Sequence, residues 1–171
     1  AYNDIIYNGS NHSMTLNGGA GNDTLTAGNA GGQLSGNEGN DTLNGGAGVD
    51  VILGGTGNDR LAGAAGNDIL TGGAGADIFA FSNHTYAGND RITDFSAAED
   101  RLNVSPFMGE LGLGWSTLNP VAAGVAHFVQ SGTAALLQFD FDGAGSAPFV
   151  TVATIDNQSA EALNANSLIW A

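Results

Sequence analysis

Aspartates recur at a fixed interval in the first half of this chain. Six of them stand at the sixth position of nine-residue units that run without a break from Gly18 to Ala80: Asp23, Asp41, Asp50, Asp59, Asp68 and Asp77. One unit has Gly32 at this position instead. Carboxylates are ligands that calcium prefers, whereas a single Gly-Asn-Asp would more simply form a turn. Six aspartates in one register therefore favour cation binding.

The element that carries these aspartates must be a short turn followed by a short strand. Position eight of every unit is large and apolar: Leu25, Leu34, Leu43, Ile52, Leu61, Leu70 and Phe79. A helix would place Leu25 and Leu34 on opposite sides, and each glycine in it would cost about 1 kcal/mol. We predict six-residue turns and three-residue strands, with two units per turn of a right-handed coil. Its parallel strands would stack into two thin sheets.

Such a coil has a thin core and crowded charges. Successive turns stack about 4.8 Å apart, so aspartates along one edge repel one another strongly. Calcium takes about six to eight oxygens, from carboxylates and from backbone carbonyls of the kind that glycine turns expose. The sequence therefore predicts that the chain does not fold unaided and that its aspartates bridge calcium ions.

These units resemble the RTX nonapeptide repeat found toward the C-termini of exported bacterial proteins. The resemblance implies a parallel β-roll with calcium ions between stacked turns. One turn provides the carbonyls of positions one and three and its Asp, and the turn eighteen residues later provides the carbonyls of positions two and four and its Asp. The carbonyl ligands implied in this way belong to Gly18, Ala20, Gly36, Asn37, Glu38, Gly39, Gly45, Ala47, Gly54, Gly55, Thr56, Gly57, Ala64, Gly66, Gly72, Gly73, Ala74 and Gly75.

The eighteen-residue pairing distributes the aspartates over two edges. Edge A carries Asp23, Asp41, Asp59 and Asp77, which gives three complete sites, so that Asp41 and Asp59 each serve two ions. Edge B carries Asp50 and Asp68, which gives one complete site; the neighbouring site is incomplete because Gly32 replaces the acid. We expect about four to six calcium ions in total.

The segment "NDRITDFSAAEDRLNVS" (89–105) resembles the stretch that follows RTX rolls in serralysin-type proteases and in alginate epimerase R-modules. That resemblance implies a last calcium site formed by Asp90 and the polar group seven residues earlier, Asn83. An amide at Asn83 departs from the usual carboxylate. For Asp94 and Asp100 we expect acids of strands and turns on a solvated face.

The expected fold is all-β, with three parts. Residues 1–17 would form a degenerate first turn, 18–80 the parallel β-roll, and 81–171 an antiparallel β cap. Ten of the 13 aromatic residues follow residue 80, so this last part can pack a conventional core. Its layout resembles the C-terminal domains of type I secreted proteins, which implies the type I secretion machinery as a partner and an extracellular bacterial location.

Composition narrows the partners. The 171 residues include 17 acidic and three basic side chains, for a net charge of −14, which repels nucleic acid and anionic membranes. No stretch approaches the roughly 18 apolar residues of a membrane span, and cysteine is absent.

Two functions remain open. No arrangement of nucleophile and base is visible and the three histidines stand in no zinc motif, so we expect a module without catalytic activity. The first reading is a calcium-driven folding and secretion module. The alternative is an accessory module that binds a glycan or cell-surface ligand through exposed aromatics such as Trp115.

Overall fold

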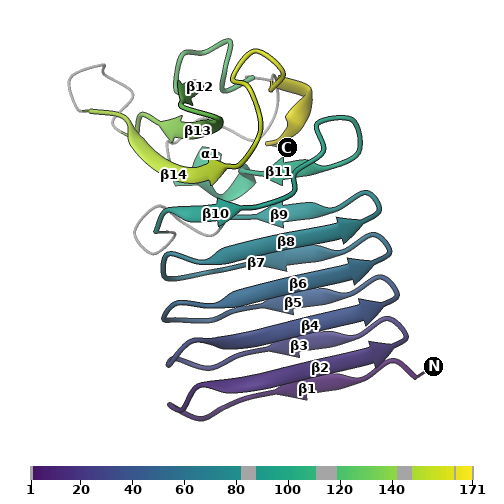
Figure 1. The fold of residues 1–171 in the computed structure, drawn as a ribbon. Coiled ribbons are helices and arrows are strands. Elements are labelled where there is room, and N and C mark those ends of the chain that lie inside the picture. The colour runs from purple at the N-terminus through teal and green to yellow at the C-terminus, as the bar shows by residue number, and fades with distance from the viewer. Residues whose placement is uncertain (1, 82–87, 111–118, 142–147, 164, 171) are drawn as a thin grey trace.

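The computed structural model describes residues 2–81, 88–110, 119–141, 148–163 and 165–170, and it is a stack of short strands closed by a cap (Figure 1). The strands are β1 (Ile5–Tyr7), β2 (Met14–Ala20), β3 (Thr24–Thr26), β4 (Gly32–Glu38), β5 (Thr42–Asn44), β6 (Val51–Thr56), β7 (Arg60–Ala62), β8 (Ile69–Ala74), β9 (Ile78–Ala80), β10 (Asp90–Ile92), β11 (Arg101–Asn103), β12 (Ala126–Ser131), β13 (Ala134–Phe139), β14 (Val150–Ile155) and β15 (Leu168–Ile169). The helical elements are α1 (Ser105–Glu110) and the 3-10 turn η1 (Ala165–Ser167).

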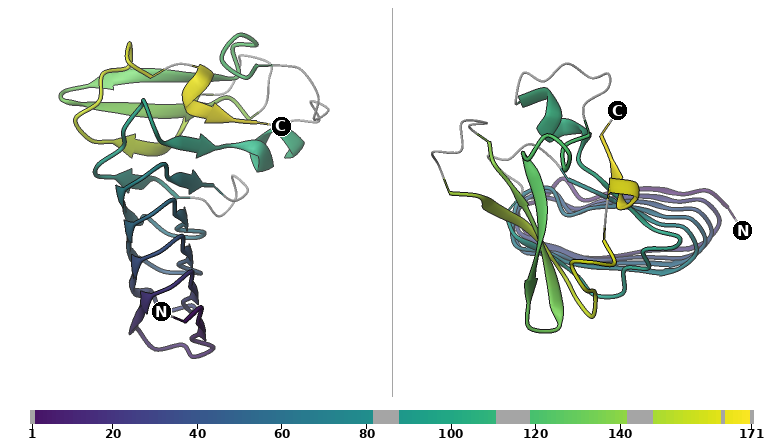
Figure 2. Two further views of the ribbon diagram at one scale, coloured as in Figure 1. Left: turned by 90° about the vertical axis from the view of Figure 1, so that its right-hand side faces the viewer. Right: turned by 90° about the horizontal axis from the view of Figure 1, so that it is seen from above.

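Alternate strands belong to opposite sheets. One sheet has the order β1-β3-β5-β7-β9-β11-β15, and the other β12-β13-β14-β10-β8-β6-β4-β2. Within the coil every pairing is parallel, and equivalent residues eighteen apart face each other, as Leu25 faces Leu43. The expected parallel β-roll is confirmed. Figure 2 shows it as a flattened tube with the cap on its C-terminal end.

The core of the roll is two columns of apolar side chains that meet between the sheets. Position eight of each unit points inward and is fully buried, because side chains alternate along a strand and only this one faces the opposite sheet. One column is Leu16, Leu34, Ile52, Leu70 and Ile92, and the other is Leu25, Leu43, Leu61, Phe79 and Leu102. Both columns continue beyond Phe79, since Ile92 and Leu102 occupy the same inward position in β10 and β11.

The cap extends both sheets. β14 pairs with β10 and β15 pairs with β11, both in parallel, whereas β12, β13 and β14 form an antiparallel meander. Among the described strands, the antiparallel arrangement expected for residues 81–171 is therefore present in β12, β13 and β14 only. β10 and β11, which lie in the range expected for the cap, continue the parallel sheets of the roll. Phe107 packs in its core with ring centroids 5.0 Å from Phe139 and 5.3 Å from Phe141.

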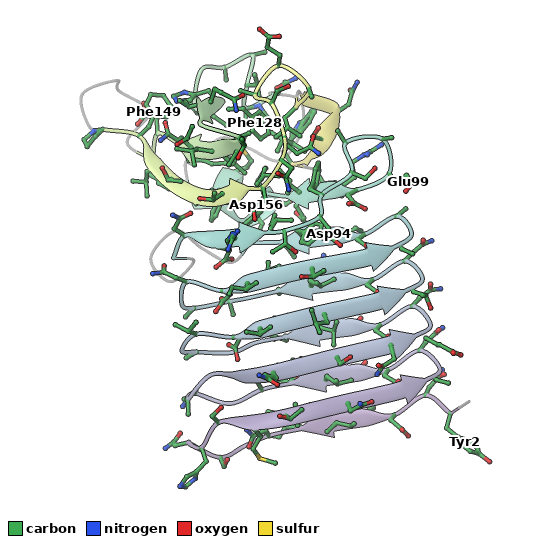
Figure 3. The ribbon with its side chains drawn as sticks, viewed as in Figure 1. Tyr2, Asp94, Glu99, Phe128, Phe149 and Asp156 are labelled. Atoms are coloured by element: carbon green, nitrogen blue, oxygen red, sulfur yellow. The ribbon has the colours of Figure 1, made fainter. Side chains whose placement is uncertain are left out.

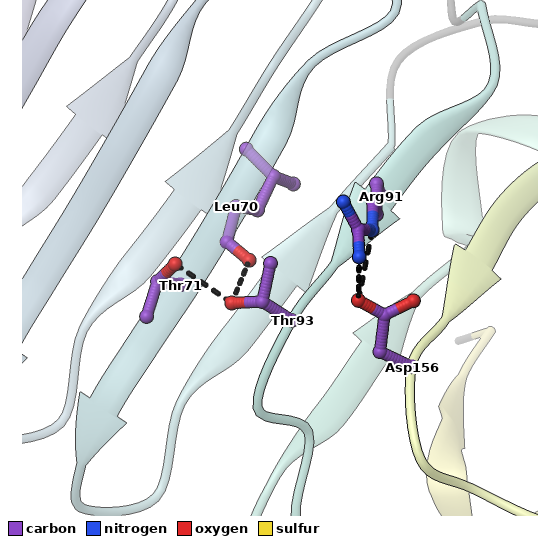
Figure 4. A network of polar contacts seen from close by, with 5 residues as sticks. All are labelled: Leu70, Thr71, Arg91, Thr93 and Asp156. Carbon is purple, nitrogen blue, oxygen red and sulfur yellow. Dashed lines mark hydrogen bonds and ion pairs between the residues drawn. The ribbon is translucent and has the colours of Figure 1, made fainter. Parts of the chain in front are cut away.

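Polar contacts join the last turn to its neighbours on the outer face (Figure 4). The Arg91 guanidinium contacts Oδ2 of Asp156 at 2.7 and 2.8 Å, and the Thr71 and Thr93 hydroxyls lie 2.7 Å apart. In the part of the chain that the structure describes, no helix has the length and apolar character needed to cross a membrane.

Candidate metal centres on the edges of the roll

The aspartates of each edge form a column. All six are buried, with at most 2% of the side chain exposed. Each lies just before the first residue of a strand, at the end of the glycine-rich turn, and so at the same height in every turn of the coil. The structure thus brings together the four aspartates of edge A and the two of edge B as the eighteen-residue spacing predicts.

A hydrogen-bond ladder fixes each carboxylate. The Asp23 backbone N–H donates to Oδ1 of Asp41 at 2.7 Å, Asp41 donates in the same way to Asp59, and Asp59 to Asp77. On edge B the Asp50 N–H donates to Oδ1 of Asp68 at 2.8 Å. The preceding turn therefore holds Oδ1 in five of the six carboxylates, those of Asp23, Asp41, Asp59, Asp68 and Asp77. Asp50 is the exception, because its Oδ1 is buried and has no hydrogen-bond partner among the described residues.

That second oxygen is unsatisfied. Oδ2 of all six aspartates is buried and has no hydrogen-bond partner among the described residues. A buried, unpartnered carboxylate oxygen costs several kcal/mol unless a cation or a proton compensates it. The ladder therefore leaves one uncompensated carboxylate oxygen at five of the aspartates and two at Asp50.

Backbone carbonyls converge on these oxygens. A Cβ on Gly45 would lie 2.6 Å from Oδ2 of Asp50 and 2.6 Å from the carbonyl oxygen of Gly63. A Cβ on Gly54 would likewise collide with Oδ2 of Asp59 and the carbonyl of Gly72. Only glycine fits at position one of these two units, and the space it leaves open is lined by a carboxylate oxygen and a carbonyl oxygen from the next turn. This donor set suits calcium.

No carboxylate cluster alone could hold the ion. In the described ranges no three His, Cys, Asp or Glu side chains lie close enough together to form a metal site. Backbone carbonyls must therefore complete the coordination, which is the division of ligands that the repeat pattern implies.

Positions two and four of the units turn their carbonyls by adopting positive φ. Gly55, Gly57, Gly73 and Gly75 have φ between 101° and 136°. Asn37 and Ala64 hold the same conformation at position two with φ of 79° and 70°, although a side chain disfavours it.

Burial also shifts the protonation of the columns. It raises the pKa of Asp50 to about 7, with a further contribution from the Asp68 charge, and that of Asp77 to about 6. It raises the pKa of Asp41, Asp59 and Asp68 as well. Burial thus makes the charged form of these five carboxylates less favourable than it is in water.

The predicted carbonyl ligands lie in the turns beside these columns. Those at position three also accept backbone N–H groups: Glu38 from Gly21, Thr56 from Gly39 and Ala74 from Gly57. A carbonyl has a second lone pair, so this bond leaves room for a metal. Their assignment as ligands stays a prediction.

The last turn contains two buried aspartates. Asp90 is 2% exposed and its Oδ1 accepts the Asp68 N–H at 3.1 Å, so it continues the column of edge B; burial raises its pKa to about 8. Asn83, its expected partner, lies outside the described residues. Asp100 is 4% exposed and accepts the Asp77 N–H, so the expectation of a solvated acid is wrong for Asp100.

The regular spacing of the repeats does not predict Asp100 as a member of the edge A column. Asp100 follows Asp77 by 23 residues instead of 18, because the last turns are longer than the others. Aligning the apolar positions Phe79 and Leu102, which face each other in the sheet, would have revealed it.

Comparison with known proteins agrees with this geometry. A family model of the RTX calcium-binding nonapeptide repeat, in four copies, matches residues 15–30, 27–61 and 53–82. Residues 15–82 are RTX calcium-binding repeats. No curated protein sequence matches the chain.

Several solved structures are similar to this chain. The AlgE6R3 subunit of the Azotobacter vinelandii mannuronan C5-epimerase is 26% identical with a TM-score of 0.52, over 100% of this chain and 81% of that one. The AlgE6R2 subunit of the same enzyme is 25% identical with a TM-score of 0.45, over 94% and 93%. The extracellular lipase LipA from Serratia marcescens is 15% identical with a TM-score of 0.39, over 94% and 40%.

Proposed function

We propose that this chain is a calcium-binding module that orders when it meets extracellular calcium, and that it thereby supports type I secretion and stabilises an exported protein that carries it. The observation that carries the proposal is the row of six buried Oδ2 atoms without a hydrogen-bond partner among the described residues. These oxygens disfavour the folded roll until a cation compensates them. Calcium binding then becomes folding free energy.

The calcium concentration outside a cell fits such a switch. Extracellular calcium modules bind with Kd of roughly 10⁻⁴–10⁻³ M. At the much lower calcium levels of a cytosol, a chain with net charge −14 and uncompensated aspartates favours the unfolded state. An unfolded chain is what a secretion channel can pass.

A calcium titration followed by far-UV circular dichroism tests the folding switch. We expect a coil-like spectrum in EGTA and a cooperative rise of β signal with calcium, and no rise with magnesium at the same concentrations. Magnesium is the control because it demands a smaller, near-octahedral site. An unchanged spectrum and thermal transition in EGTA would refute the proposal.

Secretion is tested separately. We expect a reporter fused ahead of the whole chain to appear in the medium of cells that carry a type I exporter, and to stay inside cells that lack the exporter. Equal retention in both would remove the secretion role and leave the calcium switch intact.

A second candidate is binding of a glycan, alongside calcium. The outer face of the eight-stranded sheet has an open trough of about 210 Å³ lined by residues Thr15, Gln33, Leu34, Ser35, Val51 and Leu53. The AlgE6R3 likeness favours a uronan-type polymer, which is anionic and would need bridging calcium on so acidic a surface. Trp115, the aromatic candidate from the sequence, lies outside the described residues.

Pull-down on immobilised mannuronan with and without calcium tests this candidate. We expect calcium-dependent retention that Gln33→Ala weakens and Asn29→Ala, on an exposed turn, leaves unchanged. Retention equal to that of an unrelated acidic protein would exclude it.

A further inference from the structure

We infer a further calcium site at the C-terminal end of edge A, beyond the nonapeptide array, with Asp77 and Asp100 as its pair of carboxylates. This inference rests on calcium binding by the repeats and extends it to a turn that lacks their sequence pattern. The turn is residues 94–100, "DFSAAED".

The first observation is that Asp77 repeats the geometry of the aspartates before it. Its Oδ1 accepts the Asp59 N–H at 2.8 Å, while its Oδ2 is buried without a partner in the described part of the chain. Along edge A each such oxygen faces the next turn of the coil. For Asp77 the next turn is residues 94–100, so its compensating cation must lie there.

The second observation is that Asp100 occupies the place of the next aspartate. The Asp77 N–H donates to Oδ1 of Asp100 at 2.9 Å, as the Asp41 N–H donates to Asp59 at 2.8 Å. Asp100 is also followed by β11, whose Leu102 faces Phe79 in register. Asp77 and Asp100 are therefore related in the same way as Asp59 and Asp77.

The third observation concerns the place of the position-one glycine. Gly54 faces Gly72 between β6 and β8, and Gly72 in turn meets Asp94, whose two carboxylate oxygens accept the Gly72 and Gly73 N–H groups at 2.9 and 2.8 Å. Asp94 thus replaces a glycine and fastens the last turn to the one before it.

The turn of residues 94–100 differs from the glycine-rich turns because hydrogen bonds within it hold Asp100. Oδ2 of Asp100 accepts the Ser96 N–H at 2.7 Å, and the Asp100 N–H donates to the Ser96 carbonyl. The turn is thus preorganised by its own hydrogen bonds before an ion arrives. Figure 3 labels Asp94 and Glu99, which belong to this turn, at the junction of roll and cap. We expect calcium to bind here more tightly than in the glycine-rich turns.

Counting bound calcium tests the site. Calcium per chain is measured by equilibrium dialysis and atomic emission for the wild type, Asp100→Asn and Asp156→Asn. Asp156 lies in the cap and pairs with Arg91, so its variant removes the same charge without touching edge A. We expect Asp100→Asn to bind one ion fewer than the wild type and Asp156→Asn to bind the same number. Equal counts in all three overturn the inference.

A crystal of the wild-type chain grown in calcium gives a second test that does not depend on a variant folding. We expect an anomalous difference peak between Asp77 and Asp100. Peaks in the nonapeptide turns without one here would overturn the inference and leave the proposed function standing. Absence of every peak and of bound calcium in solution would overturn both.

Discussion

At the scale of single residues, the predicted ligand aspartates are not equivalent. Asp41 accepts a hydrogen bond from Asp23 and donates one to Asp59, so it stands between two turns that each carry an acid. Asp50 has an acid only on one side, because Gly32 lies on the other. Asp41 is therefore expected to contribute to two calcium sites and Asp50 to one complete site.

We expect Asp41→Ala to raise the calcium midpoint of folding more than Asp50→Ala does. A roughly tenfold larger midpoint would correspond to the loss of about 1.4 kcal/mol of calcium-linked stability. Calcium titrations of both variants by circular dichroism measure the two midpoints. Equal shifts would argue against pairing at eighteen residues.

Ala64 is a second residue with a specific energetic role. Its φ of 70° is one that alanine disfavours by roughly 1 kcal/mol, whereas glycine adopts it freely. We expect Ala64→Gly to raise the free energy of unfolding in saturating calcium by about that amount, measured by urea denaturation. The neighbouring Ala65, which does not have a positive φ, is the control: Ala65→Gly should lower the free energy of unfolding.

At the scale of elements, each strand from β2 to β8 contributes one large inward side chain to the core of the roll. Leu61 is fully buried between the sheets, whereas Leu53 is 43% exposed on the outer face. The stability of each turn thus depends on a single apolar contact with the turns above and below it.

Leu61→Ala should therefore lower the free energy of unfolding in calcium by about 3 kcal/mol, and Leu53→Ala by less than about 1 kcal/mol. Urea denaturation at saturating calcium compares the two. Similar losses at both positions would mean that the columns of position eight do not carry the core.

Much of the roll could be predicted from the sequence because its period is nearly constant. Once the nine-residue period is recognised, it predicts the turn, the strand and the inward residue of all seven units. The prediction failed where the period changes. Because the last turns are longer, Asp100 does not lie eighteen residues after Asp77 and was not predicted to belong to edge A. Its hydrogen bond from the Asp77 N–H nevertheless continues the column of that edge.

The sequence could not reveal how the cap meets the roll. Strand pairing between β10 and β14 joins residues 63 positions apart, such as Asp90 and Ala153, and no local pattern encodes a contact of that range. The alternation of apolar residues predicted strands in the cap but not their partners.

At the scale of the whole molecule, we expect the acidic side chains to couple folding to pH as well as to calcium. The pKa values of Asp77, Asp50 and Asp90 in the folded roll are raised to about 6, 7 and 8, mainly by burial, from 3.8 in an unfolded chain. Raised carboxyl pKa values favour the folded state below the unfolded pKa, and this stabilisation is lost as pH rises through the folded values.

In calcium-stripped buffer we therefore expect the β signal to increase as pH falls from about 8.5 to about 5, the range that spans these values. In the presence of calcium the opposite trend should appear, since protons compete for the same oxygens and the calcium midpoint should rise below about pH 7. Circular dichroism at matched ionic strength measures both. A metal-free β signal that is independent of pH would contradict the assignment of buried, unpaired carboxylates.

The pairing of β14 and β15 with the last coil strands gives the molecule a polarity. A cap with its own aromatic core presents two ready strand edges onto which a turn can settle, and each settled turn offers the same two edges to the turn before it in sequence. We therefore expect the cap to order first and the roll to order from it toward the N-terminus, with calcium ions bound turn after turn. In such a chain the length of the ordered roll would be set by how far this ordering advances at the prevailing calcium level.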